Sequence, residues 1–169
     1  MVPPPPKNSD LPRPVGGRWF EDLQVGTKVD HQNRRTVTET DNVMFTTMTM
    51  NPAWLHLDAE YAAETEFGQI IVNSMYTVAL VIGISVHETT LGTTAANLGF
   101  EKINFPNPVF IGDTIRVETE VLAARPSKSR PGFGIVTFQH QGFNQHNDLV
   151  CSACRAALMH KNPNQTSEK

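Results

Sequence analysis

Residues 70–90 form the most apolar stretch of the chain, and this stretch constrains the fold more than any other feature of the sequence. Apolar side chains recur there at spacings of three and four, at Met75, Val78, Ala79, Ile82 and Val86. This spacing predicts a buried helix. Because the segment is apolar almost all round, other layers of the protein should cover the helix on most sides.

Strand-like patterns dominate the last third of the sequence. Apolar side chains alternate with charged ones over residues 115–121, which indicates a strand with one buried face. Residues 134–142 and 148–160 are also strand-like, and a loop at residues 125–131 joins the first two of these three segments. A long helix followed by consecutive antiparallel strands predicts an α+β fold, in which a sheet wraps around a central helix.

Shorter elements precede the apolar stretch. Residues 28–37 are typical of a short strand, and Thr38 is placed to cap a helix that carries residues 43–48 and breaks before Pro52. Residues 58–65 contain good helix formers, and this second helix should end near Gly68.

Length and composition indicate one domain in 169 residues. We expect a flexible proline-rich lead-in at residues 1–17, a single domain at residues 18–161 and a flexible tail at residues 162–169. The net charge of −3 comes without a basic block, which argues against a nucleic-acid partner. No apolar run reaches the ~18 residues of a membrane span, and the first residues lack a secretory pattern. The sequence thus predicts a soluble intracellular protein, either cytoplasmic or organellar.

The two cysteines are spaced as a C-x-x-C motif, which could mark a redox pair or half of a zinc site. Cys151 and Cys154 lie in a predicted strand, however, where residues three apart point to opposite faces. A zinc site also needs more ligands than these two. We therefore expect no metal site, and a structural role for both cysteines.

Polar residues that could take part in catalysis concentrate in residues 47–62, around Asn51 and His56. Each has a plain structural explanation beside a functional one. A histidine after a loop is often a hydrogen-bonded structural residue, and Asn followed by Pro favours a turn. Trp54 could pack at an edge or flank a ligand. Three further histidines share no spacing with this segment and should lie at the surface: His87, His140 and His146.

Residues 47–62 resemble the motif of the MaoC-like dehydratase, or (R)-specific enoyl-CoA hydratase, family. That motif reads glycine, aspartate, any residue, asparagine, proline, aliphatic and histidine, followed by an acidic helix start. Aligned without gaps, His56 falls on the catalytic histidine and Asn51 on the aspartate five residues before it. A rival alignment places Asn51 and Pro52 on the family's asparagine and proline, with a two-residue insertion. An amide cannot accept a proton as a carboxylate does, so the usual acid–base pair is incomplete here.

Two further segments carry the same resemblance. Residues 68–75 are similar to the family's entry into its central helix, with Asn73 and Ser74 replacing a histidine and a glycine. Residues 105–114 are similar to the family's turn of proline, valine, aromatic, glycine, aspartate and threonine. The resemblance implies a hotdog fold, which is usually dimeric, so we expect a homodimer or a higher homo-oligomer.

The resemblance also implies a hydratase or dehydratase that acts on a 2-enoyl thioester of coenzyme A, with no cofactor besides this thioester substrate. His56 would be the general base and Asn51 would orient the water. Asn73 and Ser74 would bind the substrate, with the Ser74 backbone amide stabilising the charge on the thioester oxygen. Alternatively, Ser74 is only a helix cap.

Two other functions remain open. A hotdog thioesterase would direct water against the carbonyl carbon, but such enzymes more often have an acidic residue on the central helix, and residues 74–86 contain none. A catalytically weakened acyl-CoA-binding protein is the other alternative. The densest cationic cluster lies in one loop, at Arg125, Lys128 and Arg130. This cluster either binds the coenzyme A phosphates or is a solvated hairpin.

Overall fold

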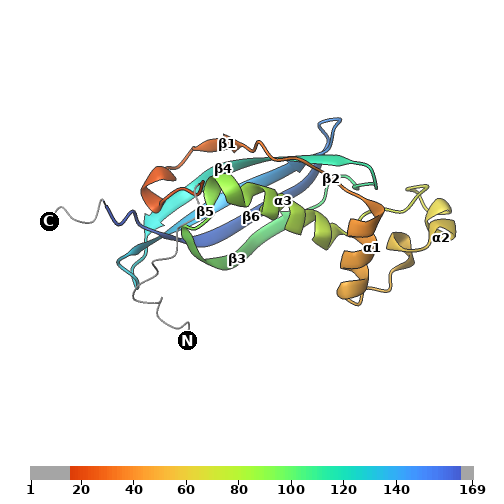
Figure 1. Cartoon of the computed structure of the whole chain (residues 1–169), viewed down its shortest axis with the longest axis horizontal. Coiled ribbons are helices and arrows are strands. Elements are labelled where there is room, and N and C mark those ends of the chain that lie inside the picture. Colours follow the sequence, from red (N-terminus) through yellow and green to blue (C-terminus); the bar gives the residue numbers. More distant parts are fainter. Residues whose placement is uncertain (1–15, 165–169) are drawn as a thin grey trace.

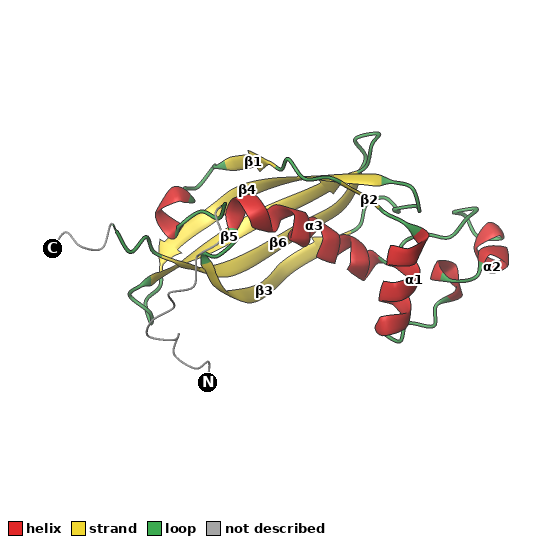
Figure 2. Ribbon diagram, viewed as in Figure 1, coloured by secondary structure: helices red, strands yellow, loops and turns green. Residues whose placement is uncertain are grey.

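The computed structural model describes residues 16–164 and shows one antiparallel sheet curved around a single long helix (Figures 1 and 2). The predicted lead-in and tail fall almost wholly outside the described residues. The sheet order is β1-β4-β5-β6-β3, and β2 pairs with β4 beside β1. The strands run as follows: β1 (Lys28–Asp30), β2 (Arg35–Thr36), β3 (Thr94–Asn104), β4 (Thr114–Pro126), β5 (Phe133–Phe143) and β6 (Leu149–His160).

The helices occupy two places relative to the sheet. Helix α3 (Ser74–Thr89) lies along the concave face, whereas α1 (Glu39–Met48) and α2 (Ala59–Ala63) lie together beyond its N-terminal end (Figure 1). Two short 3-10 turns complete the elements, η1 (Phe20–Asp22) and η2 (Trp54–His56). Among residues 16–164, no helix is both long enough and apolar enough to cross a bilayer. The predicted α+β sheet around a central helix is confirmed.

Local sequence signals explain most of the element boundaries. Thr38 caps α1 as predicted, because its hydroxyl accepts from the backbone N–H of Asp41. In turn, the Asp41 carboxylate accepts from the backbone N–H of Thr38, which completes a capping box. Hydrogen bonds from Thr38 hold the pKa of Asp41 below its usual value. The predicted strand at residues 28–37 is interrupted in the structure and forms two short strands, β1 and β2, which both pair with β4.

The core lies between α3 and the concave face of the sheet. Alternate residues of β4 and β5 are buried, as the two-residue period predicted, and Val81 of α3 packs against them. Val117 and Val150 in the sheet are fully buried with it. Removing a large side chain from such a core typically costs about 2–5 kcal/mol.

The sequence pattern did not reveal strand β3, which is the free edge of the sheet beyond β6. Most of its residues are exposed, and three register shifts interrupt its pairing, so no clean alternation develops.

The expectation that other layers cover α3 on most sides is wrong within one chain. Met75 is 54% exposed, and Ala79 and Gly83 on the same side of the helix are exposed too.

Candidate active site

Three segments meet at residues 71–73, immediately before α3. The Val72 N–H donates to the carbonyl of Val109, and Ile71 forms a bridge with Phe110. On the other side, the Ile71 N–H donates weakly to the carbonyl of Leu55 at 3.4 Å. This short extended segment therefore joins the loop that carries His56 to the turn that precedes β4.

His56 ends η2 and is held by its ring as well as by its backbone. Its Nδ1 lies 2.9 Å from the carbonyl oxygen of Ile71. A carbonyl oxygen can only accept, so Nδ1 carries the proton and Nε2 of the neutral ring is an acceptor. Nε2 makes no hydrogen bond to another residue of the described chain, and the half-buried side chain still reaches solvent. The contact therefore fixes the tautomer of the neutral ring and leaves Nε2 as an acceptor that faces no other protein group of the described residues.

Asn51 forms a turn. The residue before it, Met50, has φ of 56°, and the Asn51 side-chain oxygen accepts from the Ala53 N–H at 3.0 Å. This oxygen is therefore occupied by the loop itself, as the Asn-Pro signal indicated. Only the side-chain nitrogen has no partner among residues 16–164, and no hydrogen bond joins Asn51 to His56.

Asn73 is the N-cap of α3, and both polar atoms of its side chain have protein partners. Its oxygen accepts from the Met75 N–H at 3.0 Å, and its nitrogen donates to the Thr46 hydroxyl at 3.2 Å. Ser74 follows as the first helical residue, where a backbone N–H has no partner inside the helix. Of the two predicted substrate-binding residues, Ser74 therefore offers a free main-chain donor.

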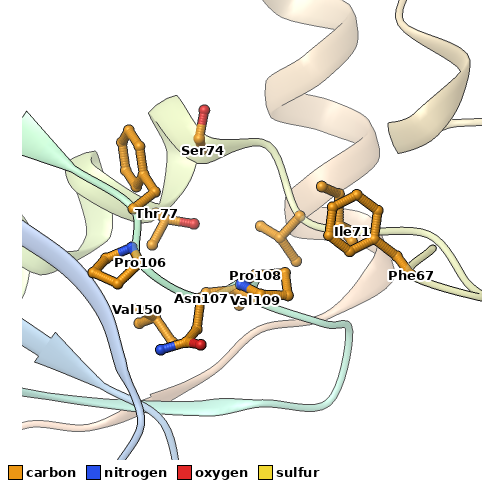
Figure 3. Close-up of a pocket in the computed structure, with 11 residues that line it drawn as sticks. Phe67, Ile71, Ser74, Thr77, Pro106, Asn107, Pro108, Val109 and Val150 are labelled. Atoms are coloured by element: carbon orange, nitrogen blue, oxygen red, sulfur yellow. The ribbon is translucent and has the colours of Figure 1, made fainter. Parts of the chain in front are cut away.

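A cavity of about 280 Å³ opens at this end of α3. Figure 3 shows Ser74 at its rim, with its side-chain hydroxyl pointing away from the other labelled residues. The lining is mostly apolar and contains no charged side chain: Phe67, Ile71, Val72, Ser74, Thr77, Phe105, Pro106, Asn107, Pro108, Val109 and Val150. The cavity is suited to an uncharged hydrocarbon group, because a charged group would lose its hydration there without a partner.

Trp54 stands at the outer side of the same loop. Its side chain is 64% exposed and meets the ring of Tyr61 edge-on, with 5.6 Å between ring centroids. This packing favours the edge role over a position inside the cavity.

The cationic cluster lies far from this cavity within one chain. Strand β4 begins shortly after Val109, which lines the cavity, and runs to Pro126 at the opposite end of the sheet (Figure 1). At ~3.3 Å per residue, Arg125 is roughly 35 Å along the strand from Thr114. Arg125, Lys128 and Arg130 are all exposed at this distant hairpin.

The cysteines lie on β6, and their side chains face opposite sides of the sheet as predicted. Burial raises the pKa of the Cys151 thiol to about 11. Burial, and then the Glu101 carboxylate at 3.8 Å, raise the pKa of Cys154. Neither thiol is activated as a nucleophile.

His140 is fully buried, so the expectation that it lies at the surface is wrong, whereas His87 and His146 are exposed as predicted. A buried polar chain beneath the C-terminal part of α3 explains it. Arg155 Nε donates to His140 Nε2 at 3.0 Å, and His140 Nδ1 lies 2.8 Å from the Thr119 hydroxyl. That hydroxyl lies 2.8 Å from Nε2 of His31, whose Nδ1 is 2.5 Å from Glu88.

The Arg155 guanidinium fixes the roles of the His140 nitrogens. Because Arg155 can only donate, Nε2 of His140 accepts, and Nδ1 carries the proton of the neutral ring and donates it to the Thr119 hydroxyl. Burial, assisted by the Arg155 charge, holds the pKa of His140 well below its usual value.

Two residues of the site were missed by the sequence analysis. Asn42 and Thr46 of α1 are fully buried, whereas Met44 and Met48 of the same helix are 56% and 76% exposed. The polar side of α1 therefore faces inward, the reverse of the usual arrangement. The available signal was the spacing of four between Asn42 and Thr46, which places both on one helix face.

Comparisons with known proteins identify the family of this chain. A profile of the MaoC-like domain matches residues 22–142. Mesaconyl-CoA hydratase from Cereibacter sphaeroides is 29% identical over 145 residues, which cover 86% of this chain and 42% of that protein. 3-Hydroxybutyryl-CoA dehydratase from Methylorubrum extorquens is 32% identical over 116 residues, 66% of this chain and 69% of that protein.

Among solved structures, a protein from Mycobacterium tuberculosis with a double hotdog fold superimposes with a TM-score of 0.80 at 24% identity. The match covers 92% of this chain and 47% of the other, so the present chain spans less than half the length of this neighbour and of the mesaconyl-CoA hydratase. The fold and the matched domain lead to one conclusion: the chain has the hotdog fold and belongs to the MaoC-like dehydratase family.

Proposed function

We propose that this chain is a hydro-lyase that interconverts a 2-enoyl thioester and a 3-hydroxyacyl thioester of coenzyme A by adding or removing water. The observation that carries the proposal is the bond from His56 Nδ1 to the Ile71 carbonyl. It leaves Nε2 as a proton acceptor, and Ile71 also lines the cavity next to Ser74. The names of the relatives, a hydratase and a dehydratase of coenzyme A thioesters, support the same chemistry.

In the hydration direction, Nε2 of His56 takes a proton from water while the water oxygen bonds to the β-carbon. The electron pair of the double bond moves toward the thioester oxygen, where the Ser74 N–H stabilises the developing charge. The proton then passes from His56 to the α-carbon, so atoms and charge balance. Asn51 can donate to the water through its side-chain nitrogen, while its oxygen already accepts from the Ala53 N–H.

The cavity suits the acyl part of such a substrate. Its lining carries no charge, and Thr77 and Asn107 are the polar side chains that accompany Ser74 in it. The hydrocarbon chain would lie among Phe67, Val72 and Val150, while the thioester carbonyl faces the helix N-terminus.

Thioester hydrolysis is less well supported by the structure. Glu88 is the one acidic residue of α3, and it lies at the C-terminal end, bound to His31 and to the Gln32 N–H. Burial opposes its ionisation, but these hydrogen bonds lower its pKa overall. A carboxylate so held is remote from Ser74 and cannot activate water there.

Pairing of two copies is a second part of the proposal. The long free edge of β3 exposes Leu98 and Phe100, and an unpaired edge of this kind invites another strand. Phe100 also lines an apolar hollow of about 500 Å³ together with residues of α1 and α3. Since the double-hotdog neighbour is about twice as long as the match, two copies of this chain would make a comparable unit.

Gly83 adds an independent reason. It lies inside α3, where glycine costs about 1 kcal/mol relative to alanine, and a Cβ there would meet nothing within 4 Å. No neighbour in the described part of the chain requires a glycine at this position. A helix or strand of a second copy that lies close to this face of α3 would require a residue without a side chain here.

The cationic hairpin stays a prediction for the coenzyme A phosphates. Because it lies at the opposite end of β4 from the cavity, it would serve the site of another copy and not that of its own chain. Reversing the charge of Arg125, Lys128 and Arg130 together should weaken acyl-CoA binding at low salt. Unchanged affinity would leave the hairpin without this role.

An assay that follows two signals in parallel tests the proposal. Crotonyl-CoA and mesaconyl-CoA are supplied separately, and the loss of the conjugated thioester absorbance is recorded beside the release of free thiol. Loss of absorbance without thiol supports a hydratase. Thiol release at the same rate shows a thioesterase, and saturable binding without either signal shows a binding protein; both outcomes overturn the proposal.

A further inference from the structure

Asn42 lies between the two segments that carry the proposed base and the proposed oxyanion donor. It is on α1, and its side chain is fully buried. Its nitrogen donates to the backbone carbonyl of His56 at 2.9 Å, and its oxygen accepts from the backbone N–H of Asn73 at 2.9 Å. One planar amide thus touches the residue that acts as base and the residue directly before Ser74.

The chemistry of these contacts requires an amide. The His56 carbonyl can only accept and the Asn73 N–H can only donate, so the bridging group must offer a donor and an acceptor together. A carboxylate would set an acceptor against the His56 carbonyl. An aliphatic side chain would leave both buried main-chain groups without partners.

Thr46 extends the same bridge one helical turn along α1. Its hydroxyl accepts from the side-chain nitrogen of Asn73 at 3.2 Å, and its carbonyl accepts from the Asn51 N–H at 3.0 Å. The inward polar face of α1 therefore holds the start of the His56 loop, its end and the N-cap of α3 at once. This explains why α1 buries its polar residues and exposes Met44 and Met48.

We propose that Asn42 is a positioning residue that fixes the separation and relative orientation of His56 and the Ser74 N–H. The inference rests on the proposed function, since both groups belong to the hydration site. Misplacement of reacting groups by about 1 Å can cost ~100-fold in rate. A side chain that ties both groups to one helix prevents such a shift.

The test replaces Asn42 by Asp, which keeps the shape and the bond to Asn73 but loses the donor to His56. The expected result is a kcat lower by ~10- to 100-fold with little change in KM, measured well below the melting temperature. Acidification that protonates the new carboxyl restores a donor, so kcat should recover in part relative to wild type as the pH falls. A merely structural role would not produce this split between kcat and KM.

Asn144→Asp provides the matched control. Asn144 is another buried amide, but it lies in the β5–β6 hairpin, where its nitrogen donates to Asp148. The control should melt at a lower temperature and keep its kcat. Unchanged kcat in a folded Asn42→Asp protein would overturn the inference, and so would an equal loss of kcat in the control.

Two more variants keep the outcomes distinct. If Asn42→Asp does not fold, Thr46→Val decides, because it removes only the acceptor for the Asn73 side chain; a reduced kcat supports the bridge and an unchanged kcat overturns it. If His56→Ala is fully active, the proposed function fails. If His56→Ala is inactive while the Asn42 and Thr46 variants keep full kcat, the function stands and the positioning role alone fails.

Discussion

The ring of His56 donates to the carbonyl oxygen of Ile71 across 2.9 Å, and this contact assigns the tautomer of the ring. The acceptor residue, Ile71, bridges Phe110, and the next residue, Val72, donates to the carbonyl of Val109. The ring of the proposed base is therefore oriented by the same backbone that leads into α3 and to Ser74.

Ser74→Pro should distinguish the role of the Ser74 backbone amide from that of its side chain. Proline removes the N–H yet suits the first position of a helix, and Asn73, with φ of −56° and ψ of 123°, already has the conformation required before proline. We expect kcat to fall by ~100- to 1,000-fold, as for loss of one oxyanion donor. Ser74→Ala is the matched control and should keep most of the activity. Equal rates for the two variants would rule out this amide as a donor.

Substitutions of Asn51 should distinguish its structural role in the turn from a role in the hydration reaction. Asn51→Asp keeps the acceptor for the Ala53 N–H, so the melting temperature should change little, whereas Asn51→Ala loses about 1 kcal/mol of unfolding free energy. The new carboxylate would favour the imidazolium form of His56 and move the acid limb of the pH–rate profile to higher pH. Asn51→Ala should cost less activity than His56→Ala. An Asp variant with the rate and pH profile of wild type would show that Asn51 does not stand at the family's aspartate position.

The buried chain from Arg155 to Glu88 should make the fold sensitive to acid. The pKa of His140 is lowered in the folded protein, so below pH ~6.5 the unfolded chain binds a proton that the folded one does not. Stability should therefore decrease as the pH falls below this value, by up to about 1.4 kcal/mol per pH unit for one proton. His140→Gln keeps a donor and an acceptor but cannot titrate. Urea unfolding between pH 7 and pH 5 should show a shallower slope for this variant, and identical slopes would contradict the assignment.

Substitutions on the exposed side of α3 should disrupt pairing of two copies. Gly83→Glu places a charge where nothing of the same chain lies within 4 Å, so the isolated subunit should tolerate it. Light scattering should then report a monomer where the wild type is a dimer. Val25→Glu, at a site 64% exposed and away from α3, is the control and should stay dimeric. A wild-type monomer at micromolar concentration would remove the basis of this prediction.

The elements that carry strong local signals could be predicted from the sequence. The α3 spacing, the Thr38 cap and the alternation in β4 each reflect one-dimensional rules, and the structure confirms them. Strand β3 escaped prediction because an exposed, irregular edge has no alternation. His140 was misplaced because the burial of a polar ring depends on Thr119 and Arg155, which come from other strands.

The candidate site, like the fold, could be predicted from the sequence only in part. The motif led us to propose His56 and Ser74 as site residues, but the acceptor for the His56 ring is a carbonyl oxygen, which no residue type reveals. The role of Asn42 depends on two main-chain groups from loops distant in sequence. Such contacts appear only when the tertiary structure brings the segments together.

The hydratase rate of His56→Ala tests the central claim most directly. The purified variant should fold like wild type, with the same far-UV spectrum and a similar melting curve, because the bond to Ile71 is the one hydrogen bond that the ring makes with residues 16–164. We expect hydration of the enoyl-CoA substrate to be slower by ~100- to 10,000-fold, the range that positioned acid–base groups supply. A folded His56→Ala protein that hydrates the substrate at the wild-type rate would contradict the account.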